Sequence, residues 1–306
     1  MSHRAERIPR ALLAARHWPA WLQIGWLRLL ALLPYRAGLA VGSAFGLIVF
    51  HLARKRRRVT AVNAALCFPE LTANERRQLV RDAFVAAGIG IVEIAWSWWG
   101  PPRGMRLRVL GAPLFEAAHA RGHGVLLLGG HFSTMDLGGR HLFQHIGRFD
   151  AIQRDNGDAA MQWAIARGRA HFCRPLERSD FRALIRSLRN GDTVWYAPDQ
   201  DFGARNSAFV PFFGHTAATL TMSTRLAAVS GATTLFIRHH RERDGYVLEF
   251  IALGEFPGAS AEADAAHYNR TLENAIRHHR EQYLWMHKRF KTQPDGNQKL
   301  YRAAHC

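Results

Sequence analysis

The chain has 306 residues, 48% of them hydrophobic, which excludes a disordered protein and one embedded throughout in a membrane. Its net charge of +17 and pI of about 11.1 call for an anionic partner: nucleic acid, a membrane surface, or a phosphorylated or acidic substrate. Cys67, Cys173 and Cys306 are scattered without CxxC spacing, so neither a disulfide framework nor a zinc site is indicated, and a reducing compartment is expected.

Two apolar segments open the chain. The first, residues 18–33, is rich in Trp and Leu and as a helix would measure about 24 Å, short of the roughly 30 Å hydrocarbon core of a bilayer. It is either a marginal membrane span or an interfacial helix. The second, residues 37–53, lacks Asp, Glu, Lys and Arg and has glycines at four-residue spacing, so it either packs closely on the first helix or forms a second short span.

A basic run, Arg54–Arg58, follows directly. Positive charge just after an apolar segment is typical of a cytoplasmic flank on anionic lipid, although a solvated helix face and a nuclear-type basic patch are alternatives. Residues 1–58 are therefore predicted to form an N-terminal membrane anchor. For the reasons that follow, residues 59–306 are predicted to form a catalytic domain.

Helical patterns dominate residues 59–99. Thr72 and Glu75 have the capping-box spacing that opens a long helix, and Gly88 and Gly90 are expected to weaken its middle.

Beyond residue 102, short apolar strands alternate with amphipathic helices. This alternation predicts an α/β fold with a mostly parallel central sheet and helices on both faces. The expected strands are 107–110, 125–128, 151–153, 193–196, 233–238 and 246–251, and the expected helices are 112–120, 137–145, 161–172, 180–189, 219–229 and 264–282.

The stretch Val125–Asp136 has the form of an active-site loop. A buried strand ends in Gly129 and Gly130, which allow a sharp turn, and open α/β sheets bind ligands at such strand ends. His131 and Asp136 would not meet on one continuous helix. They can meet if Asp136 starts the next helix, where it would orient the imidazole as a general base. The alternative is an ordinary loop histidine followed by a helix-start acid.

A second polar loop, Asp199–Arg205, follows another strand end. In a parallel sheet both loops open on the same edge, so its carboxylates and arginine would arrive near His131. Asp199 and Asp201 alone make a weak case for a cation, and no metal dependence is expected. Ser133 is not expected to be a nucleophile, because the G-x-S-x-G elbow is absent.

A series of short motifs runs through most of the chain: Leu33–Arg36, the basic run with Asn63, Cys67–Glu70, Gly130–Asp136, Trp195–Asp201, Phe209–Gly214 and Tyr283–Thr292. This series resembles the lipid A late acyltransferase family, the lauroyl and myristoyl transferases of Gram-negative lipopolysaccharide synthesis. The His-x4-Asp core is shared with glycerolipid acyltransferases at large. The Pro-Asp-Gln-Asp loop and the Trp-Met-His-Lys-Arg-Phe-Lys ending are far more specific.

The resemblance implies a glycerolipid-acyltransferase-like fold with an N-terminal membrane-associated helix and an active site on the cytoplasmic face of the inner membrane. The enzyme would move a fatty acyl group from acyl-carrier protein to a hydroxyl of a lipid A precursor. His131 would be the base and Asp136 its orienting group, with no acyl-enzyme and no cofactor. The partners would be acyl-carrier protein, the anionic lipid acceptor and the inner membrane, rather than nucleic acid.

The resemblance also implies a functional arginine after the motif, matched by Arg169 or, as the near alternative, Arg167. Backbone N–H groups near Gly130, or an arginine, would stabilise the oxyanion, and Arg169 and Arg205 would otherwise hold acceptor phosphates. The predicted binding residues are Gly130, Arg167, Arg169, Asp199, Asp201 and Arg205.

Several alternatives stay open at this point. The acceptor would be another glycolipid or phospholipid if the chain is closer to the mycobacterial phosphatidylinositol mannoside acyltransferases, which share the motif. A non-catalytic basic membrane-binding or nucleic-acid-binding protein, and a serine-type thioesterase using Ser133, are further candidates. The aromatic turn 209–214 belongs either to the core or to a surface that carries an acyl chain.

Overall fold

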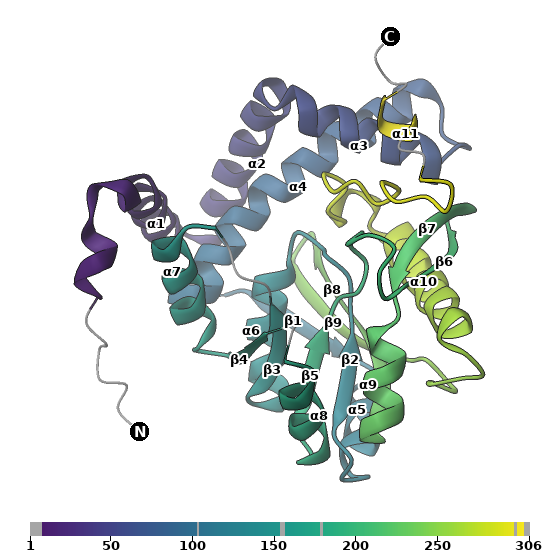
Figure 1. Ribbon diagram of the computed structural model, residues 1–306. Coiled ribbons are helices and arrows are strands. Elements are labelled where there is room, and N and C mark those ends of the chain that lie inside the picture. The colour runs from purple at the N-terminus through teal and green to yellow at the C-terminus, as the bar shows by residue number, and fades with distance from the viewer. Residues whose placement is uncertain (1–7, 103, 154–156, 178–179, 297–298, 303–306) are drawn as a thin grey trace.

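A seven-stranded sheet forms the centre of the molecule (Figure 1). The computed structural model describes residues 8–102, 104–153, 157–177, 180–296 and 299–302, so Cys306 lies outside the described residues. The strands of the sheet are β1 Arg106–Leu110, β2 Val125–Leu128, β3 Phe149–Gln153, β4 Cys173–Glu177, β5 Thr193–Tyr196, β8 Thr233–Glu242 and β9 Gly245–Ala252. Their order is β1-β9-β8-β2-β5-β3-β4. Only the β8–β9 pairing is antiparallel, which confirms the mostly parallel sheet.

Helices cover both faces of this sheet, as predicted. In chain order, the helices of the described residues are α1 Trp18–Leu30, α2 Tyr35–Leu52, α3 Arg54–Cys67, α4 Ala73–Trp99, α5 Ala112–His119, α6 Met135–Ile146, α7 Ala159–Arg169, α8 Phe181–Arg189, α9 Met222–Ser230, α10 Ala261–His278 and the short α11 Lys299–Arg302, of which α1, α2, α3 and α11 pack on other helices. Alternation along β2 separates two cores. Leu126 and Leu128 share a cluster with residues of α8, α9 and α10, whereas Val125 and Leu127 share one with residues of α5, α6 and α7.

The sequence pattern missed β4 and a hairpin, β6 Ser207–Phe212 with β7 His215–Leu220. β4 contains Pro175, which a sheet tolerates here because β4 is an edge strand. The helix expected from residue 219 begins at Met222, because Thr219 and Leu220 belong to β7. Phe213 at the hairpin turn is buried with a positive φ of 49°, so the aromatic turn is part of the core.

The second apolar segment packs on α4, not on the first helix (Figure 1). A Cβ atom on Gly42 would lie 2.6 Å from Ile89 Cα, and one on Gly88 would lie 2.3 Å from the Gly42 carbonyl oxygen. A Cβ atom on Gly90 would lie 2.6 Å from the Ser133 carbonyl oxygen. Gly88 and Gly90 therefore mark close approaches of α4 to α2 and to the His131 loop, rather than weak points of the helix.

The N-terminal helices also carry much exposed apolar surface. The exposed large apolar side chains of this region are Trp18, Leu22, Trp26, Leu29, Leu32, Val41, Phe45, Ile48 and Leu52. Within the described residues, α2 alone is long and apolar enough to cross a membrane, and only 17% of it is buried. α1 has 13 residues, fewer than a span needs. The boundary expected after residue 58 falls inside α3, and that division stays a prediction.

Candidate active site

His131 lies in the loop between β2 and α6, and Asp136 lies in the first turn of α6, as expected. Backbone hydrogen bonds tie this loop to the segment after α10. The Leu284 N–H donates to the His131 carbonyl at 2.9 Å, and the Ser133 N–H donates to the Gln282 carbonyl at 2.7 Å. The carboxy-terminal motif thus holds the histidine loop in place.

Asp199 is the group that holds the His131 ring. The Nδ1 atom of His131 lies 2.5 Å from Asp199 Oδ1, and the His131 backbone N–H donates to Asp199 Oδ2 at 2.9 Å. The Tyr283 hydroxyl donates to the same Oδ2 at 2.9 Å. Because β5 pairs with β2, the loops after the two strands open on one edge, and the predicted meeting of Asp199 with His131 is observed.

The Asp199 carboxylate is ionised, although its side chain is only 1% exposed. Burial by itself would raise the pKa of Asp199. The electrostatic interaction with His131 and the hydrogen bonds from His131 and Tyr283 outweigh burial and lower the pKa of Asp199 to about 2. An ionised acceptor at Nδ1 keeps the proton on that nitrogen and leaves Nε2 as the proton acceptor.

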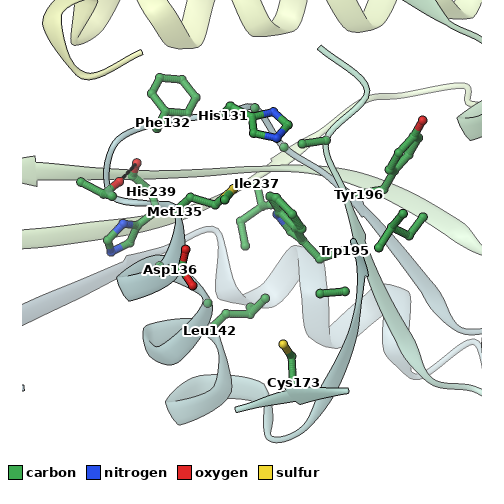
Figure 2. Close-up of a pocket in the computed structure, with 18 of the residues that line it drawn as sticks. His131, Phe132, Met135, Asp136, Leu142, Cys173, Trp195, Tyr196, Ile237 and His239 are labelled. Atoms are coloured by element: carbon green, nitrogen blue, oxygen red, sulfur yellow. Dashed lines mark hydrogen bonds between the residues drawn. The ribbon is translucent and has the colours of Figure 1, made fainter. Parts of the chain in front are cut away.

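The prediction that Asp136 orients the ring is wrong. Both Asp136 oxygens pair with Arg169, whose Nε donates to Oδ1 at 2.8 Å and whose Nη2 donates to Oδ2 at 2.9 Å. Burial by itself would lower the pKa of Arg169, but the Asp136 charge and hydrogen bonds raise it. Figure 2 shows His131 and Asp136 apart on the pocket wall, because the loop carries the ring toward β5 while α6 carries the carboxylate toward α7.

Some of the other predicted binding residues lie away from this site. Asp201 is buried and accepts hydrogen bonds from the backbone of Gly203 and from the backbone and hydroxyl of Thr292, so its role is to tie its loop to the carboxy-terminal segment. Arg205 is exposed outside the pocket lining. Arg167 is exposed over the Trp163 ring, so Arg169 is the arginine that faces the pocket.

A cavity of about 470 Å³ starts at His131 and continues between the sheet and α6. Asp136, Arg169 and Gln200 line it as polar residues. Figure 2 shows Trp195, Leu142 and Cys173 progressively farther from His131. The apolar wall of the cavity is formed by Leu142, Phe149, Phe172, Trp195, Ile237 and Leu248. The space is suited to a ligand with a polar head and a long apolar tail.

The sequence did not identify Gln282 and Tyr283 as parts of the site, although Tyr283 begins the Tyr283–Thr292 motif that carries the resemblance. Their contacts with the His131 loop and Asp199 depend on a chain reversal after α10. Across the described ranges, no group of three or more His, Cys, Asp or Glu side chains is placed to hold a metal ion.

A histidine hydrogen-bonded to a buried carboxylate lies beside an apolar pocket in this α/β fold, an arrangement suited to acid–base chemistry on a lipid-like substrate. Residues 7–292 match the profile of a family described as bacterial lipid A biosynthesis acyltransferase, and the chain belongs to that family. It is therefore an acyltransferase of lipid A biosynthesis.

The relatives differ in the acyl chain that their names state. The chain is 36% identical over 294 residues to the lipid A biosynthesis lauroyltransferase of Escherichia coli (strain K12), covering 94% of this chain and 95% of that protein. It is 32% identical to the palmitoleoyltransferase of the same organism, covering 96% and 98%, and 26% identical to its myristoyltransferase, covering 94% and 91%. These identities assign the family but not the acyl chain.

Proposed function

We propose that the protein transfers a fatty acyl chain from the thioester of acyl-carrier protein to a hydroxyl of a lipid A precursor, with His131 as general base. The observation that carries this proposal is the buried, ionised Asp199 on His131 Nδ1, which leaves Nε2 free to accept the hydroxyl proton. Asp199 is a positioning residue that also stabilises the imidazolium formed during reaction.

In the proposed reaction, the acceptor oxygen attacks the thioester carbonyl while His131 Nε2 takes its proton. The tetrahedral oxyanion then collapses, the carbon–sulfur bond breaks, and the departing thiolate takes the proton from the imidazolium. The Gly129 N–H already donates to the Tyr196 carbonyl, so the Gly130 N–H and the Arg169 guanidinium are the proposed oxyanion donors.

Direct transfer without an acyl-enzyme is supported by Ser133. Its Oγ atom is buried and has no hydrogen-bond partner among the described residues, so it is not paired with His131. A serine nucleophile needs such a pairing with its base. The apolar wall of the pocket is the proposed site of the acyl chain, and the net charge of +17 suits an acidic carrier protein and an anionic lipid.

We further propose that α1 and α2 attach the enzyme to the bacterial inner membrane with the active site on its cytoplasmic face. The support is the exposed apolar surface of both helices and the basic run Arg54–Arg58 that follows them. Membrane flotation of the full chain, with and without a high-salt wash, tests this attachment. A protein that leaves the membrane completely in high salt would contradict apolar insertion.

The reaction is tested by incubating membranes that contain the full chain with acyl-carrier-protein donors of several chain lengths and a tetra-acylated lipid A precursor. Mass spectrometry should show the precursor heavier by one acyl chain, and His131→Ala should abolish this product. Other glycolipid and phospholipid acceptors are tested in parallel. Absence of acylated product with every donor and acceptor refutes the transferase proposal, and fatty acid released without an acceptor would favour a thioesterase.

A further inference from the structure

A second pocket, of about 410 Å³, lies beside the catalytic one. The two pockets share their walls: α6 contributes Gly139 to the catalytic pocket and Arg140 to the second, and the turn after α7 contributes Phe172 to the first and His171 to the second. We call the second pocket the basic–aromatic pocket. Its lining residues are Arg28, Trp98, Trp99, Arg140, Phe143 and His171.

The two arginines in this pocket form no ion pair with any residue that the structure describes. Within residues 8–102, 104–153, 157–177, 180–296 and 299–302, neither Arg28 nor Arg140 has a carboxylate oxygen within 4.0 Å. Arg140 Nη1 donates to the Ser97 carbonyl at 2.8 Å, but its buried Nε has no acceptor in the described part of the chain. An unpaired buried donor on a cation is costly, and a bound anion would offset that cost.

The pocket is also rigidly built. Arg28 lies over the Trp99 ring, with its guanidinium carbon 5.5 Å from the ring centroid. α1, which carries Arg28, lies against α4 and α7 (Figure 1), where Trp21 packs on Trp163 at a centroid distance of 5.7 Å. Arg28 and Arg140 therefore line one pocket from α1 and α6, two helices that both pack on α4. A planar guanidinium matches the oxygens of a phosphate group.

The position of the pocket indicates what carries the anion. Arg28 follows exposed Trp26 and precedes exposed Leu29 on α1, so the pocket lies beside the apolar surface proposed to enter the membrane. A phosphate beside a membrane-inserted surface is that of a lipid headgroup. The tryptophan and phenylalanine walls of the pocket would pack against the apolar atoms of the lipid next to the phosphate.

We propose that the basic–aromatic pocket binds a phosphate group of a lipid, and that this is a phosphate of the acceptor whose hydroxyl reaches His131. This inference rests on the proposed function, because it places the acceptor's reacting hydroxyl in one pocket and its phosphate in the adjoining one. A phosphate of a bilayer lipid has the same chemistry and is the other source to be tested.

The test compares Arg28→Gln and Arg140→Gln with Arg148→Gln. Arg148 is an exposed arginine just after α6 and outside both pockets, so it gives the same charge change. Steady-state kinetics use the phosphorylated lipid A precursor and the same lipid after phosphate removal. Each pocket variant should raise KM for the phosphorylated lipid about tenfold or more, with kcat little changed. Neither should alter KM for the dephosphorylated lipid, and Arg148→Gln should behave as wild type.

Equilibrium binding to the same two lipids, and to vesicles of phosphatidylglycerol or phosphatidylcholine, does not depend on turnover. It therefore separates this inference from the proposed function: if the wild type transfers no acyl chain, the binding arm still tests the pocket. Loss of phosphatidylglycerol binding with unchanged precursor binding assigns the pocket to a bilayer phosphate. Unchanged binding of both lipids in folded Arg28→Gln and Arg140→Gln proteins overturns the inference. Arg140→Lys, which keeps the charge, should retain part of the binding if phosphate is the ligand.

Discussion

The orientation of His131 depends on a carboxylate 68 residues away in the sequence. Asp136, the acid nearest in the motif, is engaged by Arg169 instead. The motif therefore contains two separate units: the proposed proton acceptor His131, held by the loop after β5, and an ion pair that presents Arg169 to the pocket. Each unit leads to a different mutational result.

Replacing Asp199 with Asn should lower kcat about 10²- to 10⁴-fold while KM changes little. The amide removes the negative charge that stabilises the imidazolium of His131 during the reaction. Tyr283→Phe, which removes only one of the hydrogen bonds to Asp199, should have a smaller effect in the same direction. Steady-state kinetics at saturating donor measure both.

Asp201→Asn is the matched control for this prediction, because Asp201 is a buried carboxylate of the same loop whose partners are structural. Asp201→Asn should lower the thermal midpoint, and its kcat per folded molecule should stay close to that of the wild type. Equal losses of kcat in Asp199→Asn and Asp201→Asn would argue against a specific role for Asp199.

Removing Arg169 alone should destabilise the fold by about 3–5 kcal/mol, because it leaves the buried Asp136 carboxylate unpaired. The double variant Asp136→Asn with Arg169→Gln removes both charges and should recover most of that stability. It should not recover activity if the guanidinium acts on the oxyanion. Chemical denaturation and turnover, measured on the same preparations, separate the two effects, and full activity in the stable double variant would remove Arg169 from the mechanism.

At the scale of elements, the backbones of α2 and α4 lie so close together that only glycine fits at the contact. Gly42→Ala should lower the free energy of unfolding by about 1–3 kcal/mol, because its Cβ would lie 2.6 Å from Ile89 Cα. Thermal unfolding in detergent measures this loss.

Gly25→Ala on α1 is the matched control, because no atom lies within 4 Å of its added Cβ. The change is the same and both sites are helical, so helix propensity favours alanine at each by up to about 1 kcal/mol. Gly25→Ala should therefore be neutral or stabilising. Equal behaviour of the two variants would show that α2 does not pack on α4 as described.

The sequence pattern predicted most of these elements. A central strand that is covered on both faces has a continuous apolar run, and a long helix has capping and breaking residues at its ends. The prediction failed for β4, where Pro175 interrupts the apolar pattern, and for β7, whose Thr219 and Leu220 read as the start of a helix. An edge strand and a hairpin obtain their stability from pairing partners elsewhere, which a local pattern does not contain.

At the scale of the whole molecule, buried histidines make stability depend on pH. Burial, followed by the charge of Arg140, lowers the pKa of His141 to about 4, and burial lowers the pKa of His287 to about 4. His141 Nδ1 and His239 Nε2 lie 2.9 Å apart, and the pKa of His239 is also lowered by burial. All three histidines are therefore neutral in the folded protein and protonate more easily once unfolded.

Because the unfolded chain binds these protons more tightly, the three histidines give full stability above the unfolded pKa near 6.5, and this stability is lost as the pH falls toward 4. The loss should be on the order of 1–2 kcal/mol at pH 5 for each of His141 and His287. Asp199 affects stability in a separate pH range. Because its pKa is lowered to about 2 in the folded protein, its contribution to stability is lost only below about pH 4. Thermal midpoints at pH 7.5, 6 and 5 measure the effect. His141→Gln should flatten the slope between pH 6.5 and 5, and a wild-type midpoint independent of pH over this range would contradict it.

By itself, the sequence determined the α/β class, the position of His131 at the end of a buried strand, the arrival of Asp199 at the same edge and the family. These depend on local periodicity, turn residues and the rule that parallel strands present their carboxyl ends together. Only the tertiary structure decided which acid pairs with which base, that α2 rests on α4, and that the segment after α10 holds the His131 loop. Such contacts join residues far apart in the chain, so they depend on strand order and helix packing that no local pattern specifies.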